Sequence, residues 1–190
     1  MSGRTDELYR LIVQHCSPTL VGLKTANMFT FALDSQEELR CELCAINRRL
    51  SGKGLRVIPL RYRCGKALIY VYRPERLKCD LQSSEACGVL ESCGYSCGEC
   101  AGRQLSQLIS RLRTSDEFPH EIGLFLGYPP EDVIGFIERR PCVLSGLWKA
   151  YGDPDEAQRR FDRLRHCTEV WCKCWPEGVP LERLTVASRV

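Results

Sequence analysis

The sequence lacks any long run of apolar residues. Residues 1–10 are mostly polar, and the apolar stretch from Leu11 to Val13 is too short for the core of a signal peptide. No run reaches the roughly 20 apolar residues that a membrane-spanning helix needs. We therefore expect a cytoplasmic protein that makes no contact with a membrane.

The chain also lacks a strong charge of one sign. Its 27 basic and 24 acidic residues leave a formal net charge of +3, and the two signs are interspersed. Such a balance leaves no basic patch that could bind nucleic acid, so we do not expect nucleic acid as a partner. Internal repeats and low-complexity segments are absent as well. With 44% hydrophobic residues, the 190-residue chain can bury a core and is not disordered.

Cysteine, by contrast, is abundant. The chain has 13 cysteines, and the odd total argues against a complete set of intrachain disulfides. Cytoplasmic thiols are kept reduced, so clustered cysteines favour metal binding or redox chemistry over structural disulfides.

The first 73 residues show the pattern of a small sheet. Alternation over 28–33 predicts a strand, Ser35 followed by Glu38 predicts a capped helix, and residues 56–63 and 67–73 predict a hairpin. Pro59 cannot donate to a ladder, so its strand is expected at an edge. From residue 74 onward the periodicity is helical. We predict an α+β fold: a three-stranded mixed sheet (strand, helix, hairpin) in residues 1–73, with a predominantly helical part, residues 74–190, packed on it in a single domain.

Cys16 is a candidate nucleophile. An amphipathic helix is expected over residues 6–14, and Ser17 followed by Pro18 predicts the N-cap and first residue of a second helix. Cys16 would then lie just before a helix N-terminus, where the helix dipole favours the thiolate. The alternative is that Cys16 is a small buried side chain.

Residues 117–138 are tightly punctuated by glycine and proline. The pattern predicts two short helices joined by an elbow, with Gly127 at the C′ position of the first helix and Pro130 at or near the start of the second. His120 and Glu121 would open the first helix, where a neutral imidazole can serve as a base or metal ligand. The alternative is that both residues cap their own helix.

Cysteine spacing suggests one metal site. Cys93, Cys97 and Cys100 form a C-x3-C-x2-C pattern among glycines, which lets three thiolates converge on a zinc ion or an iron–sulfur cluster. A fourth ligand could come from Cys87 or Cys79. The alternative is a turn that tolerates several cysteines. Cys41 and Cys44, at C-x2-C spacing, are expected to be buried beside the apolar stripe of their helix.

Four segments together resemble an uncharacterised family. The sequence reads His-Cys-Ser-Pro-Thr-Leu at residues 15–20, running into Leu-Lys-Thr-Ala-Asn at 23–27, and Trp-Lys-Ala-Tyr-Gly-Asp at 148–153; residues 118–137 and 181–187 also match. The chain thus resembles domain-of-unknown-function family 3793, found mostly in anaerobic Gram-positive bacteria. The resemblance implies no established activity. Because the family's genes often lie near flavodoxin-like and iron-transport genes, it implies iron or redox physiology and a partner from redox or iron metabolism.

These observations favour three functions in order. The first is a metal- or redox-linked binding protein that uses cysteine thiols and His120. The second is a small cysteine-dependent enzyme in which Cys16 is the nucleophile, His120 the base and Glu121 its orienting carboxylate. The third is a helical protein-interaction or nucleic-acid-binding module at residues 117–138, against which the acidic residues of the second helix argue.

Overall fold

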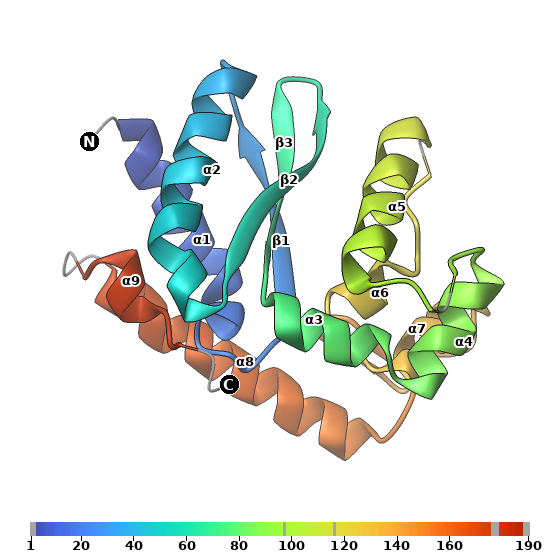
Figure 1. Cartoon of the computed structure of the whole chain (residues 1–190). Helices are drawn as coiled ribbons and strands as arrows, with labels where there is room; N and C mark the ends of the chain where they lie inside the picture. Colours follow the sequence, from blue (N-terminus) through green and yellow to red (C-terminus); the bar gives the residue numbers. More distant parts are fainter. Residues whose placement is uncertain (1–2, 97, 116, 176–178, 188–190) are drawn as a thin grey trace. The chain divides into compact units, whose positions relative to one another are not determined.

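The protein has the predicted α+β architecture, with a three-stranded sheet near the N-terminus and helices beyond it (Figure 1). The computed structural model describes residues 3–96, 98–115, 117–175 and 179–187. The chain divides into two units, residues 1–75 with 167–190 and residues 76–166. The boundary after residue 75 lies close to the predicted change of pattern, but the last segment of the chain returns to the first unit.

The sheet of the first unit contains β1 (Ala26–Ala32), β2 (Arg56–Arg63) and β3 (Lys66–Tyr72). Its order is β1–β3–β2, and both ladders are antiparallel. The prediction of a mixed sheet was therefore wrong. Helix α2 does return the chain so that β1 and β2 run the same way, but β3 inserts between them and is antiparallel to both.

Local signals for the hairpin were correct. Cys64 and Gly65 join β2 to β3 with φ angles of 48° and 66°, the backbone of a type I′ turn. Pro59 lies on the edge strand β2, and the register shifts between Pro59 and Arg61. The central strand β3 is the most buried, as its apolar run predicts.

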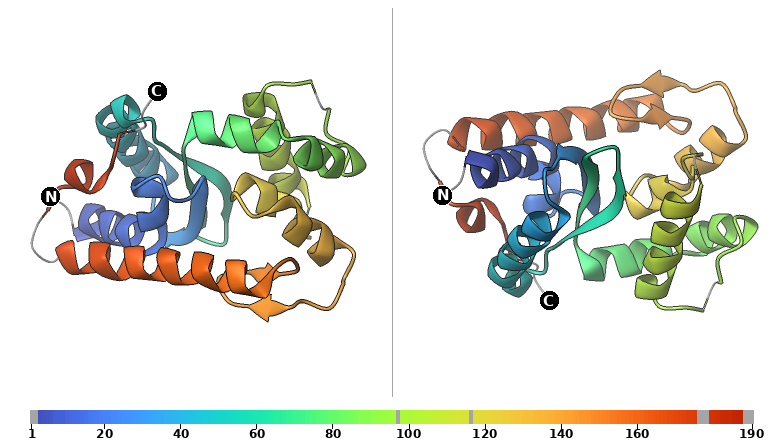
Figure 2. Two further views of the ribbon diagram at one scale, coloured as in Figure 1. Left: turned by 90° about the horizontal axis from the view of Figure 1, so that it is seen from below. Right: turned by 90° about the horizontal axis from the view of Figure 1, so that it is seen from above.

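Helix α2 (Gln36–Leu50) begins where the capping pattern predicts. The Ser35 side chain accepts a hydrogen bond from the backbone N–H of Glu38. One face of the helix carries four buried residues: Leu39, Leu43, Ile46 and Leu50. Helices α1 and α2 lie on the same side of the sheet (Figures 1 and 2), and their apolar faces form the core of the unit with buried residues of all three strands. A short 3₁₀ helix, η1 (Ser51–Lys53), follows α2.

Helix α1 spans Gly3–Leu20 without a break, so the predicted helix start at Ser17 was wrong. Pro18 lies within the last turn of α1, where few helical hydrogen bonds remain to be lost. The Ser17 hydroxyl donates back to the carbonyl of Val13 instead of capping a new helix. Gly22, with a φ of 80°, then turns the chain into β1.

The C-terminal segment completes the first unit. Helix α9 (Leu181–Leu184) buries Leu181 and Leu184 against the core. The buried guanidinium of Arg73 donates to the carbonyls of Thr19, Leu20 and Val186 at 2.6–2.7 Å. One charged side chain thus ties the end of α1 to the C-terminal segment.

The second unit is mainly helical. Its elements are α3 (Pro74–Leu81), which begins at the boundary, α4 (Ser84–Ser92), α5 (Ala101–Thr114), α6 (Ile122–Phe125), α7 (Pro130–Ile137), the hairpin of β4 (Leu144–Ser145) and β5 (Lys149–Ala150), and the first part of α8 (Pro154–Cys174), which continues into the first unit. The hairpin was not predicted. None of the helices in the described part of the chain is long and apolar enough to cross a membrane.

Candidate functional site

The elbow between α6 and α7 forms as predicted. Gly127 has a φ of 73° at the C′ position of α6, and Pro130 is the first residue of α7. The backbone N–H of Gly127 donates to Leu124, and that of Tyr128 donates to Gly123, which is the Schellman pattern. The elbow is therefore fixed by backbone hydrogen bonds and by a glycine that can adopt the left-handed conformation.

Glu121 and His120, predicted to act together, have different surroundings. Glu121 is buried, and its carboxylate accepts hydrogen bonds from Tyr95 Oη at 3.0 Å and Arg111 Nη1 at 2.9 Å. Arg111 also lies over the Tyr95 ring and donates to the carbonyl of Cys93. Burial, followed by the charge of Glu121, raises the pKa of Tyr95. These contacts join α5, α6 and the loop after α4, so the Glu121 carboxylate holds these elements together.

His120 is exposed and lies just before the N-cap of α6. Its ring meets the edge of Phe136 at a centroid distance of 5.0 Å and an interplanar angle of 80°. Phe136 is itself 41% exposed. A role for His120 as a base or metal ligand stays a prediction.

Cys16 has no exposed surface and lies in the C-terminal part of α1, not before a helix N-terminus. Burial raises the pKa of its thiol well above the ordinary value, so the dipole argument for a thiolate was wrong. Burial also lowers the pKa of Lys24 to about 8, although the nearby Cys16 acts in the opposite direction. Cys16 belongs to the first unit and His120 to the second. Its role as a nucleophile stays a prediction.

The predicted metal ligands lie between α4 and α5. Cys93 is the C-cap of α4 and is half-buried, Cys100 is the exposed N-cap of α5, and Cys97 lies outside the described residues. Burial and the nearby Glu121 raise the pKa of Cys93. Among the residues that the structure describes, no three His, Cys, Asp or Glu side chains are grouped as a metal site. The zinc or iron–sulfur site stays a prediction.

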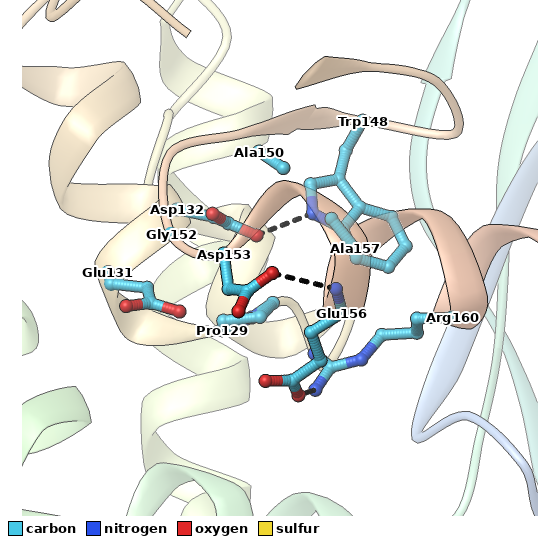
Figure 3. Close-up of a pocket in the computed structure, with 10 residues that line it drawn as sticks. All are labelled: Pro129, Glu131, Asp132, Trp148, Ala150, Gly152, Asp153, Glu156, Ala157 and Arg160. Atoms are coloured by element: carbon cyan, nitrogen blue, oxygen red, sulfur yellow. Dashed lines mark hydrogen bonds and ion pairs between the residues drawn. The ribbon is translucent and has the colours of Figure 1, made fainter. Parts of the chain in front are cut away.

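A second buried carboxylate, Asp132, organises the residues after the elbow (Figure 3). It accepts hydrogen bonds from Trp148 Nε1 at 2.7 Å and from the Tyr151 backbone N–H at 2.6 Å. The Trp148 ring stacks on Tyr128 and meets the edge of Phe161. Asp132 thus joins α7 to the β4–β5 hairpin.

The hollow beside Asp132 is small. Figure 3 shows the side chains of Glu131, Asp153 and Glu156 around it, with Arg160 paired to Glu156. Its volume of about 20 Å³ is enough for one water molecule. Asp153 also accepts hydrogen bonds from the N–H groups of Asp155 and Glu156 at the start of α8. The residues around the hollow pack closely, and the hollow is too small for an organic substrate.

Two of the exposed thiols lie close together in sequence on α2. Cys41 and Cys44 are both exposed, which corrects the expectation that they are buried. They are three positions apart and line one groove with Gln36, Glu37, Arg40 and Arg48. Thiols are usually buried in proteins, so two exposed thiols three positions apart, with Arg40 and Arg48 beside them, form a chemically available pair.

The sequence contained a signal for this exposure. At 100° per residue, the stripe formed by Leu39, Leu43, Ile46 and Leu50 faces one side of α2, and positions 41 and 44 fall on the opposite side. The C-x2-C spacing alone does not predict exposure, whereas the phase of positions 41 and 44 relative to the stripe does.

A family model described as "Protein of unknown function (DUF3793)" matches residues 12–185. The match includes both halves of the α6–α7 elbow, the Trp148 motif and α9. No curated protein and no solved structure gave a match.

Proposed function

Because this chain belongs to the DUF3793 family, whose function is unknown, we propose a function from its own residues: a thiol-based redox protein whose working pair is Cys41 and Cys44. The observation that carries the proposal is the exposure of both thiols, three positions apart on one face of α2. It keeps the thiol chemistry expected from the sequence and assigns it to different cysteines.

The charges of the groove favour an anionic substrate. Arg40 and Arg48 line the same groove as the two cysteines, with Glu37 as the opposing charge. The two arginines attract an anionic substrate to the thiols.

The reaction is a two-electron exchange with a disulfide, RSSR. The thiolate of the first cysteine attacks one sulfur of RSSR, forms a mixed disulfide and releases RS⁻. The thiolate of the second cysteine attacks the protein sulfur of that mixed disulfide and releases the second RS⁻. RSSR is reduced to two thiols, and the protein is oxidised to one intrahelical disulfide, with the two thiol protons passing to the two leaving thiolates.

A disulfide between Cys41 and Cys44 can form within α2, but the two Cβ atoms must move closer together than they are in a regular helix. Side chains three apart on a helix have Cβ atoms about 5–6 Å apart, whereas a disulfide needs Cβ atoms about 3.5–4.5 Å apart. Closure must tighten this turn of α2 toward 3₁₀ geometry, in which positions i and i+3 eclipse. We therefore expect the oxidised pair to be readily reduced, as suits a redox couple.

The proposal is tested by equilibrating the protein with oxidised and reduced glutathione at several ratios, trapping with iodoacetamide and analysing peptides by mass spectrometry. A disulfide joining Cys41 and Cys44 should appear across the series and be absent in Cys41→Ser. Cys64→Ser is the matched control, because Cys64 is also exposed but lies on the β2–β3 turn. If Cys41 and Cys44 stay as free thiols while other cysteines oxidise, the proposal is wrong.

A further inference from the structure

A hollow on the first unit adjoins the groove of the reactive pair and shares Cys41 with it. It is bounded by the first turns of α1, the end of β1 and the start of α2, which lie side by side in Figures 1 and 2. Its volume is about 340 Å³, within the range of about 300–1,000 Å³ typical of small-molecule sites.

The lining of this hollow is apolar inside and acidic at the rim. Its apolar wall is formed by four side chains: Leu8, Phe31, Leu33 and Leu39. Glu38 and Glu42 supply carboxylates, and no lysine, arginine or histidine lines it among the residues whose side chains the structure describes. Glu42 accepts a hydrogen bond from Thr5 at 3.0 Å, which holds one carboxylate in place between α1 and α2.

We propose that this hollow binds a small molecule with an apolar body and a cationic amine. The apolar wall removes hydrocarbon from water, and the two carboxylates pair with the ammonium group. A carboxylate ligand would meet two like charges and is disfavoured. Two neighbouring sites of opposite charge therefore lie on α2, since the groove that holds both thiols contains Arg40 and Arg48.

Cys41 connects the two sites, because it lines the hollow as well as the groove, whereas Cys44 lines the groove alone. A ligand in the hollow should cover Cys41 and leave Cys44 open. The binding itself does not depend on the proposed redox function, since it needs no disulfide. The labelling rate of Cys41 serves only to detect the bound ligand.

The test uses the reduced full chain with n-hexylammonium as probe, and hexanoate as the probe of opposite charge. Iodoacetamide labelling of Cys41 is measured in Cys44→Ser, and labelling of Cys44 in Cys41→Ser. Hexylammonium should slow labelling of Cys41 by about threefold or more, with a Kd on the order of 1 mM for so small a ligand. Hexylammonium should not change the labelling of Cys44, and hexanoate should not protect Cys41 more than it protects Cys44.

Two exposed carboxylates one residue apart provide matched variants. Glu38→Gln should weaken the protection of Cys41, because Glu38 lines the hollow, and Glu37→Gln should not, because Glu37 lines the groove. Equal protection by hexylammonium and hexanoate would overturn the amine as the ligand class. No protection, or equal slowing of Cys41 and Cys44, would overturn the site. None of these outcomes depends on disulfide formation, so failure here and failure of the redox proposal are distinguishable.

Discussion

Among single residues, Lys24 and Cys16 have opposite effects on how stability depends on pH. Lys24 has a pKa lowered from 10.5 to about 8 by burial. Between these values the unfolded chain holds a proton that the folded chain lacks, so the free energy of unfolding rises with pH. Buried Cys16 keeps its proton above the ordinary thiol pKa of 9.0, where the unfolded chain loses it, so its effect has the opposite sign.

We therefore expect the free energy of unfolding to rise between pH 8 and 9, and we expect this rise to be opposed above pH 9 by Cys16 and by the other thiols whose pKa burial raises: Cys93, Cys167 and Cys172. Urea unfolding at intervals of half a pH unit measures the free energy. Cys16→Ala should make its slope above pH 9 more positive, because one of the opposing thiols is removed. Lys24→Met should remove the rise, and a rise of equal size in that variant would disprove the assignment.

Single residues also show why the candidate site was predicted only in part. Cys41 and Cys44 were recognised by their spacing, but their exposure depends on the phase of the apolar stripe of α2. The buried state of Cys16 depends on α1 continuing through Pro18, which overrides the local start signal of Ser17 and Pro18. Local signals compete at such positions, and tertiary packing decides between them.

At the scale of elements, glycines let α7 approach the segment after the β4–β5 hairpin. A Cβ at Gly135 would clash with the ring of Tyr151, and one at Gly123 would lie 2.8 Å from Val133 Cγ2. These two glycines lie in helices, where alanine is otherwise the better residue. Their role is therefore close packing between elements of the second unit.

Gly135→Ala should destabilise the protein by about 1–3 kcal/mol, because the added methyl group forces Tyr151 to move. Gly88→Ala is the matched control within α4. Nothing lies within 4 Å of a Cβ there, so this change should stabilise by up to about 1 kcal/mol. Denaturant midpoints of the two variants provide the comparison, and two shifts of the same sign would contradict the packing argument.

Elements with strong local signals were predicted well. The Ser35 cap, the Cys64–Gly65 turn, Gly127 and Pro130 each depend on a few neighbouring residues. The order of the sheet was not predictable in this way, because placing β3 between β1 and β2 depends on pairing across long sequence distances. For the same reason the sequence could not show the hollow beside Cys41, which three separate elements enclose.

At the scale of the whole molecule, the first unit depends on the last residues described. Leu181 and Leu184 are buried in its core, and Val186 accepts a hydrogen bond from Arg73. Trp171 Nε1 also donates to the carbonyl of Leu184 at 2.8 Å. The C-terminal segment is thus an integral part of a unit that begins with α1.

Removal of residues 181–190 should destabilise the first unit by roughly 3–6 kcal/mol, because two buried leucines and the acceptors of Arg73 and Trp171 are lost. Thermal unfolding followed by circular dichroism measures the loss. Removal of residues 188–190 alone is the control, since it leaves those contacts in place. Equal melting temperatures for the two truncations would show that the segment contributes nothing.

The return of residues 167–190 to the first unit also determines the order in which a nascent chain can complete its folding. The second unit, residues 76–166, is synthesised before Val186, so Arg73 still lacks the carbonyl of Val186 while that unit is made. At about 5–20 residues per second, roughly 7–26 s pass between the synthesis of the end of α2 and that of α9, and the apolar faces of α1 and α2 lack the C-terminal segment during this time. We expect the chain to need a chaperone during this interval and not after folding is complete.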